Sequence, residues 1–215
     1  MATYVQIKRR TAYLRGETDY TTSTTNTVID DHINATVQDA CNLYPYSFTL
    51  STGTLTLSSG SANLPSDYNP KWHIKDARIT ASSQNDDSVF TEINTVDRDL
   101  YGSGDYVYWI TYNSSTHVYV FNSKTLTGSV DIFYNFIPTD MSSDGDVCII
   151  PDAELVSYGA ASKMWVGDER NTELATLYEQ EYRQRAGALY QADQAFGPAE
   201  PQGTIIRMNS RLRRV

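Results

Sequence analysis

The stretch VDIFYNFIPTDMSSDGDVCIIPDAELVSYGAASKMWV, residues 130–166, contains the point at which the chain changes from strand to helix. Apolar and polar residues alternate over residues 130–136, and this period of two predicts a half-buried β-strand. A loop with a proline near each end, residues 138–151, follows this strand. Asp152 then offers a side-chain cap for a helix over residues 153–166. The stretch therefore predicts a sheet that is followed by helices.

Upstream of this stretch, short runs with a period of two continue back to residue 47. Leu50 ends a first run, the sequence Ser51-Thr52-Gly53 predicts a turn, and a second run follows at residues 55–57. Further strands are predicted over residues 62–64, 72–79, 89–93, 106–112, 117–121 and 130–136. A single helical turn is predicted at residues 95–100, and a hairpin turn at residues 113–115. Many short strands separated by turn signals predict an antiparallel sandwich or a small barrel-like sheet.

The N-terminal part of the chain has helical periodicity instead. Residues 5–14 can form about two helical turns, and a threonine-rich segment follows them. Thr27 fits the N-cap of a second helix, with Asp30 placed to return a bond to the cap backbone. Apolar residues then recur at helical spacing until Pro45, which ends the helix.

The C-terminal part adds two more helices, so that helical segments from both ends can pack together. The last helix is predicted to begin at Asp168 or Thr172 and to end near residue 196, before Gly197-Pro198. We therefore predict an α+β fold: a helical bundle from N- and C-terminal helices, with an inserted antiparallel β domain and an extended C-terminal arm. The predicted segments are residues 1–46 for the first bundle helices, 47–137 for the β domain, 138–196 for the loop and the last bundle helices, and 197–215 for the arm.

The C-terminal helices carry residues suited to close helix contacts. Gly159 and Ala160 are small, so another helix backbone can approach them closely. Tyr178 and Tyr182 offer large contact areas with a polar tip. We expect these four residues to contribute to packing between subunits, although tight packing inside one chain explains the small residues equally well.

Basic residues concentrate at the two ends of the chain. Of the 17 lysines and arginines, eight lie within the first 15 and the last nine positions. Residues 16–206 therefore hold nine basic residues and all 26 acidic ones, a net charge of −17. Such an acidic body does not bind nucleic acid, because phosphate contacts require cations. The basic ends are expected to contact an acidic partner; solvated termini are the alternative.

The C-terminal arm combines apolar and basic side chains. Residues 204–208 resemble a short strand, and an arginine-rich segment follows. Because a free tail has nothing against which to bury apolar residues, we expect the arm to become ordered on a partner. The residues expected to contact that partner are Ile205, Ile206, Arg207, Met208, Arg211, Leu212, Arg213 and Arg214.

No motif in the sequence predicts catalysis or a cofactor. The three histidines have no ligand spacing, and no phosphate loop, dinucleotide fingerprint or nucleophile elbow occurs. Asp140, Ser142, Asp144 and Gly145 match part of a calcium-binding loop, but Pro151 stands where a bidentate glutamate is needed. We interpret this segment as an acidic surface loop, and we expect neither an enzyme nor a metal protein.

The start of the chain has no apolar segment typical of an export signal, and no run of about 20 apolar residues could span a membrane. Cys41 and Cys148 are therefore expected to be buried thiols and not a disulfide.

Four short segments, taken in order, carry a resemblance to a known family. They are Ile33-Asn34-Ala35 with Tyr44-Pro45-Tyr46; Leu64-Pro65-Ser66-Asp67-Tyr68; Phe133-Tyr134-Asn135-Phe136-Ile137-Pro138; and Ile149-Ile150-Pro151 before the paired helices. Together they resemble the head-to-tail adaptor proteins of tailed bacteriophages, also called head-completion or connector proteins, and most closely the podovirus-type tail adaptors. The resemblance covers most of residues 1–196.

The resemblance implies a helical bundle with an inserted β domain and a homo-oligomeric ring, commonly of twelve copies, below the portal protein. Such a ring lies at the head–tail junction of the virion, continues the DNA channel without sequence-specific binding, and docks tail nozzle, hub or fibre proteins. The family's C-terminal segment, here residues 203–215, would reach the portal. An acidic body also suits a DNA conduit, because like charges repel.

Two other interpretations remain open. The chain could be another virion structural protein, such as a tail-completion or fibre-attachment module. It could also be a carbohydrate-binding β-sandwich with accessory helices, for which Trp72 and Trp109 would supply aromatic contacts.

Overall fold

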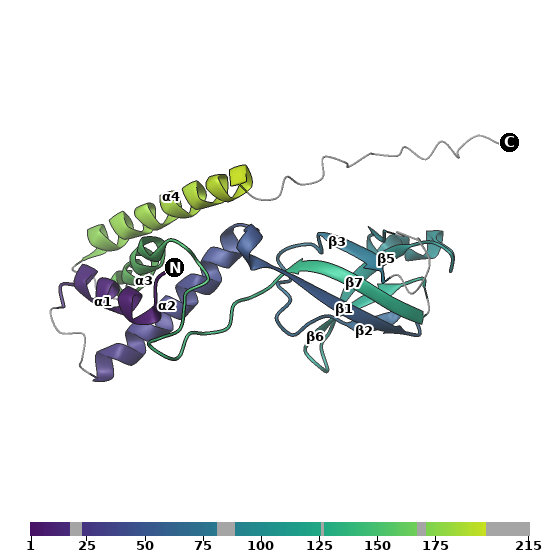
Figure 1. Cartoon of the computed structure of the whole chain (residues 1–215), viewed down its shortest axis with the longest axis horizontal. Coiled ribbons are helices and arrows are strands. Elements are labelled where there is room, and N and C mark those ends of the chain that lie inside the picture. The colour runs from purple at the N-terminus through teal and green to yellow at the C-terminus, as the bar shows by residue number, and fades with distance from the viewer. Residues whose placement is uncertain (18–22, 81–88, 126, 167–170, 197–215) are drawn as a thin grey trace.

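The computed structural model describes residues 1–17, 23–80, 89–125, 127–166 and 171–196. Figure 1 shows the helices gathered at one end of the molecule and the strands at the other. The helices are α1 (Tyr4–Leu14), α2 (Ser23–Leu43), α3 (Ala153–Val166) and α4 (Thr172–Phe196), with short 3-10 helices η1 (Ser47–Thr49) and η2 (Thr95–Leu100). The strands are β1 (Leu50–Ser58), β2 (Ser61–Asn63), β3 (Asp76–Ile79), β4 (Thr91–Glu92), β5 (Val107–Asn113), β6 (Val118–Ser123) and β7 (Thr127–Asn135). The predicted α+β class is confirmed.

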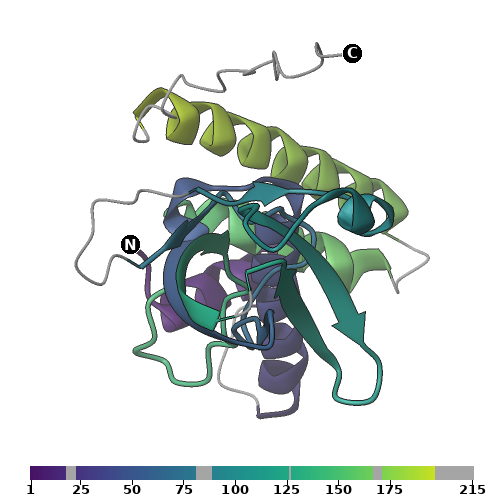
Figure 2. The ribbon, with the colours of Figure 1, turned by 90° about the vertical axis from the view of Figure 1, so that its right-hand side faces the viewer.

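Residues from all four α-helices contribute to one hydrophobic core. Helix α3 contacts α1, α2 and α4. Figure 2, seen from the sheet end, shows α4 in yellow-green across the upper side of the molecule. Leu155 and Val156 of α3 are fully buried in this core, together with Ile7 of α1 and Ile33 of α2. Asp152 caps α3 as predicted, because its Oδ1 accepts the backbone N–H groups of the second and third helical residues at 2.9 and 3.2 Å.

The seven strands form one sheet in the order β3-β7-β1-β2-β6-β5-β4. The longest pairing joins β1 and β7, which run antiparallel from Leu50 opposite Asn135 to Ser58 opposite Thr127. The neighbouring pairs are antiparallel, apart from the short parallel pair of β4 and β5. A second hydrophobic core fills the sheet, where Phe121 stacks on Tyr108 with ring centroids 4.9 Å apart.

The sheet is nearly closed on itself. Arg78 in β3 forms a bridge with Val89, and the Phe90 N–H donates to the Ala77 carbonyl at 2.8 Å. Residues 89–91 therefore connect β3, at one edge of the sheet, with β4 at the other. Of the two predicted arrangements, the structure has the barrel-like sheet, with few unpaired edges left exposed.

A buried polar junction connects the helices to the sheet. The Asn135 side chain, only 1% exposed, donates to the Tyr46 carbonyl at 3.2 Å and to Thr49 Oγ1 at 2.6 Å. The indole N–H of Trp72 donates to the Cys41 carbonyl at 3.0 Å. Because a buried polar group is costly when it loses its partner, these bonds fix how the two parts meet.

Several predicted boundaries were wrong. Helix α2 begins at Ser23, so Thr27 lies inside it and is not the N-cap. Serine, threonine and asparagine lower helix propensity by only a fraction of a kcal/mol, and they did not stop this helix. The turn predicted at residues 51–53 lies within continuous strand β1, where Gly53 pairs with Ile132. A Cβ at Gly53 would lie 3.4 Å from both the Pro65 and Tyr134 side chains, which is an ordinary contact, so the strand does not require glycine here.

Other predictions held. The helical turn at residues 95–100 is confirmed as η2, although its cap is Asn94, and the hairpin at residues 113–115 joins β5 to β6. The strand predicted over residues 72–79 is shorter and comprises only β3. The arm, residues 197–215, lies outside the described residues.

Candidate assembly surfaces

Helix α3 presents a small residue where three helices cross. A Cβ added to Gly159 would lie 2.5 Å from Thr36 Cγ2 of α2 and 2.8 Å from Tyr182 Cδ2 of α4. Contacts this short do not occur between real side chains, so this position requires glycine for α2 and α4 to approach α3. Ala160 and Tyr182 are also buried in the same core.

The four residues predicted to pack between subunits all have partners inside the chain. Tyr178 in α4 donates its hydroxyl to the Leu14 carbonyl at 3.2 Å, and its ring lies 5.6 Å from that of Tyr158. Burial raises the pKa of Tyr182, so this phenol stays neutral. A role for these residues between subunits stays a prediction, and what they do in one chain is to set the spacing of the helices.

The proline-bracketed loop, residues 138–151, is fixed to the helices by a buried lysine. Lys8 of α1 is only 6% exposed; its Nζ pairs with Asp30 of α2 at 3.0 Å and with Asp144 of the loop at 3.1 Å. The same ammonium lies 4.1 Å from the centre of the Tyr4 ring. Sequence reasoning missed this contact, although Lys8 stands between Tyr4 and Thr11 on the apolar face of α1.

The loop uses its acidic residues for its own structure. Asp144 is paired with Lys8, and the Asp146 carboxylate accepts the backbone N–H groups of Ser142 and Ser143 at 2.8 and 2.9 Å. The bonds from Ser143 and Ser142 lower the pKa of Asp146, which stays ionised. Within the part of the chain that the structure describes, no group of three potential ligand side chains could hold a metal ion.

A groove of about 350 Å³ lies between this loop, α2 and the end of β7. Val37, Phe136 and Ile149 line it with apolar surface, while Asp140 and Asp146 add carboxylates. Because Val37 lies about 100 residues before the other lining residues, which fall between 136 and 149, the sequence alone gave no signal for the groove.

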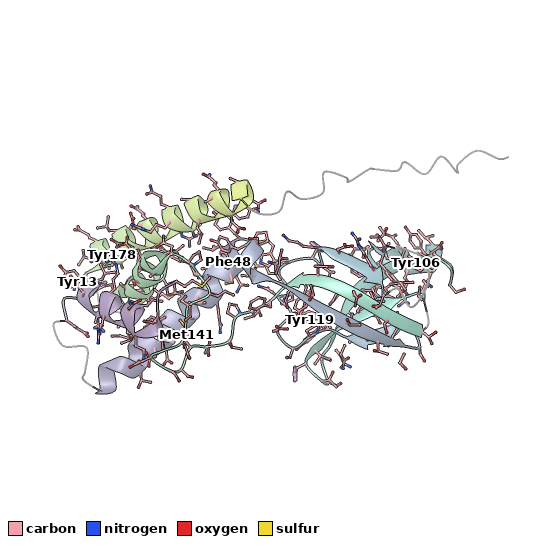
Figure 3. All side chains as sticks on the ribbon, in the orientation of Figure 1. Tyr13, Phe48, Tyr106, Tyr119, Met141 and Tyr178 are labelled. Carbon is pink, nitrogen blue, oxygen red and sulfur yellow. The ribbon has the colours of Figure 1, made fainter. Side chains whose placement is uncertain are left out.

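Exposed apolar side chains occur at both ends of the molecule. The helical-end patch consists of Tyr13, Val166 and Leu177, which are 78%, 73% and 55% exposed. The sheet-end patch consists of Val96, Leu100, Tyr101 and Tyr106, of which Val96 and Leu100 are about 80% exposed. Figure 3 shows Tyr13 and Tyr106 at opposite ends of the molecule.

The sheet also carries a polar cluster beside a shallow depression of about 530 Å³. His73 Nδ1 lies 3.0 Å from both Glu92 carboxylate oxygens, and the Tyr108 hydroxyl donates to Glu92 at 3.1 Å. Burial, followed by the nearby Glu92 carboxylate, raises the pKa of Tyr108. Here Glu92 serves as the acceptor that holds His73 and Tyr108, and no metal-ligand group occurs among the described residues.

The two cysteines are free and buried in the helical part, as predicted. Burial, followed by the neighbouring Cys148 thiol, raises the pKa of Cys41 to about 12. A thiol with so high a pKa is not a nucleophile near neutral pH. None of the helices in the described ranges is long and apolar enough to cross a membrane.

The helices share one core, the strands form a nearly closed sheet, and exposed apolar residues occur in both parts. The sequence model of the SU10 adaptor protein family matches residues 2–202. The chain belongs to this family. The match covers both parts of the SU10 adaptor fold described above and extends into the arm, and it confirms the resemblance to phage head-to-tail adaptors. A search of curated proteins found no match.

Family membership establishes a coarse function. The SU10 adaptor family comprises structural proteins of phages, so the chain is a phage structural adaptor, and its place is the virion. The family is one of structural adaptors and not an enzyme family. The predicted partner-binding residues of the arm, from Ile205 to Arg214, lie outside the described residues.

Proposed function

We propose that the chain forms a ring with copies of itself, commonly twelve, below the portal protein of the phage head. The observation that carries this proposal is the match to the adaptor family over residues 2–202. A closed ring requires two different surfaces on each subunit, a heterologous interface. The helical-end and sheet-end patches supply exposed apolar surfaces at opposite ends of one subunit, where separate partners can bind.

In this proposal the helices and the strands have separate roles. Residues 1–46 and 138–196 form a helical bundle, residues 47–137 form an antiparallel β domain inserted into it, and residues 197–215 form a basic arm. Two separate hydrophobic cores, one in the helices and one in the sheet, support this division. In the ring, neighbouring subunits would pack against the helical surface. The spacing of the helices that form this surface depends on Gly159, Ala160, Tyr178 and Tyr182.

The arm is proposed to contact the portal through Ile205 to Met208 and Arg211 to Arg214. Its arginines suit an acidic surface, and its apolar residues would be buried there. The sheet-end patch would dock tail nozzle, hub or fibre proteins. Exposed apolar residues on a capped, hydrogen-bonded turn such as η2 are typical of a docking site.

DNA is proposed to pass through the ring without sequence-specific contacts. The excess of acidic residues in the body, net −17 over residues 16–206, would repel phosphate from the channel wall. Neutralising channel carboxylates should slow DNA ejection or the completion of packaging. Unchanged infectivity after such substitutions would contradict this role.

Co-sedimentation with the portal protein from the same genome tests the assembly. The full chain should sediment with the portal as a ring, and Arg211→Glu should weaken binding. Arg183→Glu is the matched control, because Arg183 is an exposed arginine of α4 that pairs with Glu179. If all three chains are folded and none binds, the protein is another tail or fibre-attachment component. If both variants bind as well as the native chain, the arm is not the portal contact.

A further inference from the structure

The groove described above is apolar and bordered by carboxylates. Val37 of α2, Phe136 after β7 and Ile149 of the loop form its apolar wall, and Asp140 and Asp146 lie beside it. None of the groove's described lining residues is basic. A ligand that fits this surface must bring both apolar and cationic side chains.

The groove is held open by hydrogen bonds on both sides. Asn34 of α2 exchanges two bonds of 3.0 Å with the backbone of Met141. Gln38 of the same helix donates to Asp140 at 2.8 Å, and Cys148 donates its N–H to the Ala2 carbonyl at 3.1 Å. Because the loop is fixed to α1 and α2, binding in the groove does not require the loop to be ordered first.

The chain itself contains a segment with the required composition. Residues 204–214, TIIRMNSRLRR, combine four apolar side chains with four arginines. The nineteen residues 197–215 could extend over roughly 60 Å, enough to reach a neighbouring molecule. The apolar wall of the groove is complementary to the apolar side chains of this segment, and the carboxylates of the groove are complementary to its arginines.

We propose that this groove binds residues 204–214 of the C-terminal arm of a second copy of the chain. In Figure 1, α4 ends on the upper side of the molecule, whereas Figure 3 places Met141 of the groove-lining loop on the lower side. The arm of a neighbouring copy is long enough to reach the groove. The arm of one copy then binds the groove of the next copy. Because arm and groove are different surfaces of the chain, the contact runs head to tail and can close a ring.

This inference rests on the proposed ring, for which it supplies one subunit contact between copies that have not yet bound the portal. The groove holds the arm while the protein is free. The portal then competes for the same arginines, so groove and portal are alternative sites for the arm. Removal of the arm from the groove would accompany attachment to the head.

Cross-linking between two full-length variants tests the contact. One chain carries Val147→Cys, at an exposed groove position, and the other carries Ser210→Cys in the arm. The native Cys41 and Cys148 are buried and do not compete. After mild oxidation of the mixture, a disulfide-linked dimer of the two variants is expected. The matched control replaces Val147→Cys by Val96→Cys, at an exposed position of the sheet-end patch, and should give little dimer with the arm variant.

Charge changes sharpen the test. Asp140→Asn can still accept from Gln38, yet it should slow cross-linking by about two- to fivefold, the effect of one exposed ion pair. Raising the salt to about 1 M, where the Debye length is about 3 Å, should have a similar effect. A chain with both Val147→Cys and Ser210→Cys shows whether the arm bonds within its own chain.

The outcomes separate the two proposals. Absence of the mixed dimer, equal yield with the Val96→Cys control, or cross-linking only within the double variant would overturn the groove assignment. None of these results bears on portal binding, which co-sedimentation measures. A mixed dimer without portal binding would support the groove and contradict the portal contact.

Discussion

Gly159 offers the sharpest test of the helical packing. A Cβ at this position would lie 2.5 Å from Thr36 Cγ2 and 2.8 Å from Tyr182 Cδ2. Neither neighbour can move easily, since Thr36 is β-branched and both side chains are buried in a close-packed core. Overpacking of this kind costs about 1–3 kcal/mol. Alanine regains about 1 kcal/mol of helix propensity over glycine. Gly159→Ala should therefore lower the free energy of unfolding by about 1 kcal/mol.

Gly187 is the matched control in α4. A Cβ there would meet only the Tyr44 hydroxyl at 3.6 Å, an ordinary contact. Gly187→Ala should therefore gain the helix propensity without strain, up to about 1 kcal/mol. Urea unfolding followed by far-UV circular dichroism, at one protein concentration for all variants, should separate the two variants by about 2 kcal/mol.

A double-mutant cycle identifies the cause of the loss. Thr36→Ser removes the methyl group that would clash and keeps the hydroxyl that donates to the His32 carbonyl at 2.7 Å. Alone, it should cost about 0.5–1.5 kcal/mol, as for other buried methyl deletions. In a chain that already carries Gly159→Ala, adding Thr36→Ser should lower the free energy of unfolding by less than Thr36→Ser does alone, and this difference would reveal coupling between the two sites. If Gly159→Ala proves as stable as Gly187→Ala, the three helices do not cross as closely as described.

Four further predictions concern stability and burial. Asn135→Asp puts a carboxylate where the structure needs a donor, so it should destabilise the chain by about 1–3 kcal/mol at pH 7. Because burial raises the carboxyl pKa, the loss should shrink as the pH falls toward about 4, where the protonated group can donate; a loss that is independent of pH in urea titrations would argue against this junction. Lys8→Met leaves Asp144 without its ammonium partner and should lower the free energy of unfolding by about 1–3 kcal/mol, whereas exposed Lys71→Met should change it little; equal effects in urea titrations would contradict the buried ion pairs. Cys41 has a pKa near 12 when folded and an ordinary value of 9.0, so its contribution to stability should be intact below pH 9 and decline as the pH rises toward 12. In the native state at pH 8 neither buried cysteine should react with a thiol reagent, and both should react in urea; rapid native labelling would refute their burial.

Local signals in the sequence predicted the elements well. The N-cap at Asp152, the helical turn at residues 95–100 and the hairpin at residues 113–115 each depend on neighbouring residues, and each was confirmed. The turn predicted at residues 51–53 failed because pairing with β7 outweighed the local preference of Ser, Thr and Gly.

Contacts between distant segments could not be predicted in the same way. The ion pairs of Lys8 involve Asp30 and Asp144, which lie far away along the chain. Helical spacing already placed Lys8 on an apolar face, which signals a buried charge but does not identify its partner. The groove depends on two distant segments that meet only in the folded chain, and the closure of the sheet depends on the position of residues 89–91.

The way in which the chain enters and leaves the sheet has an evolutionary consequence. The Phe136 N–H donates to the Thr49 carbonyl at 2.9 Å, so the segment between these two residues starts and finishes at neighbouring points. A segment with adjacent ends can be exchanged, lengthened or shortened by recombination while the helices keep their positions. Replacing one continuous piece of the gene would thus exchange the sheet and leave the sequence of the four α-helices unchanged.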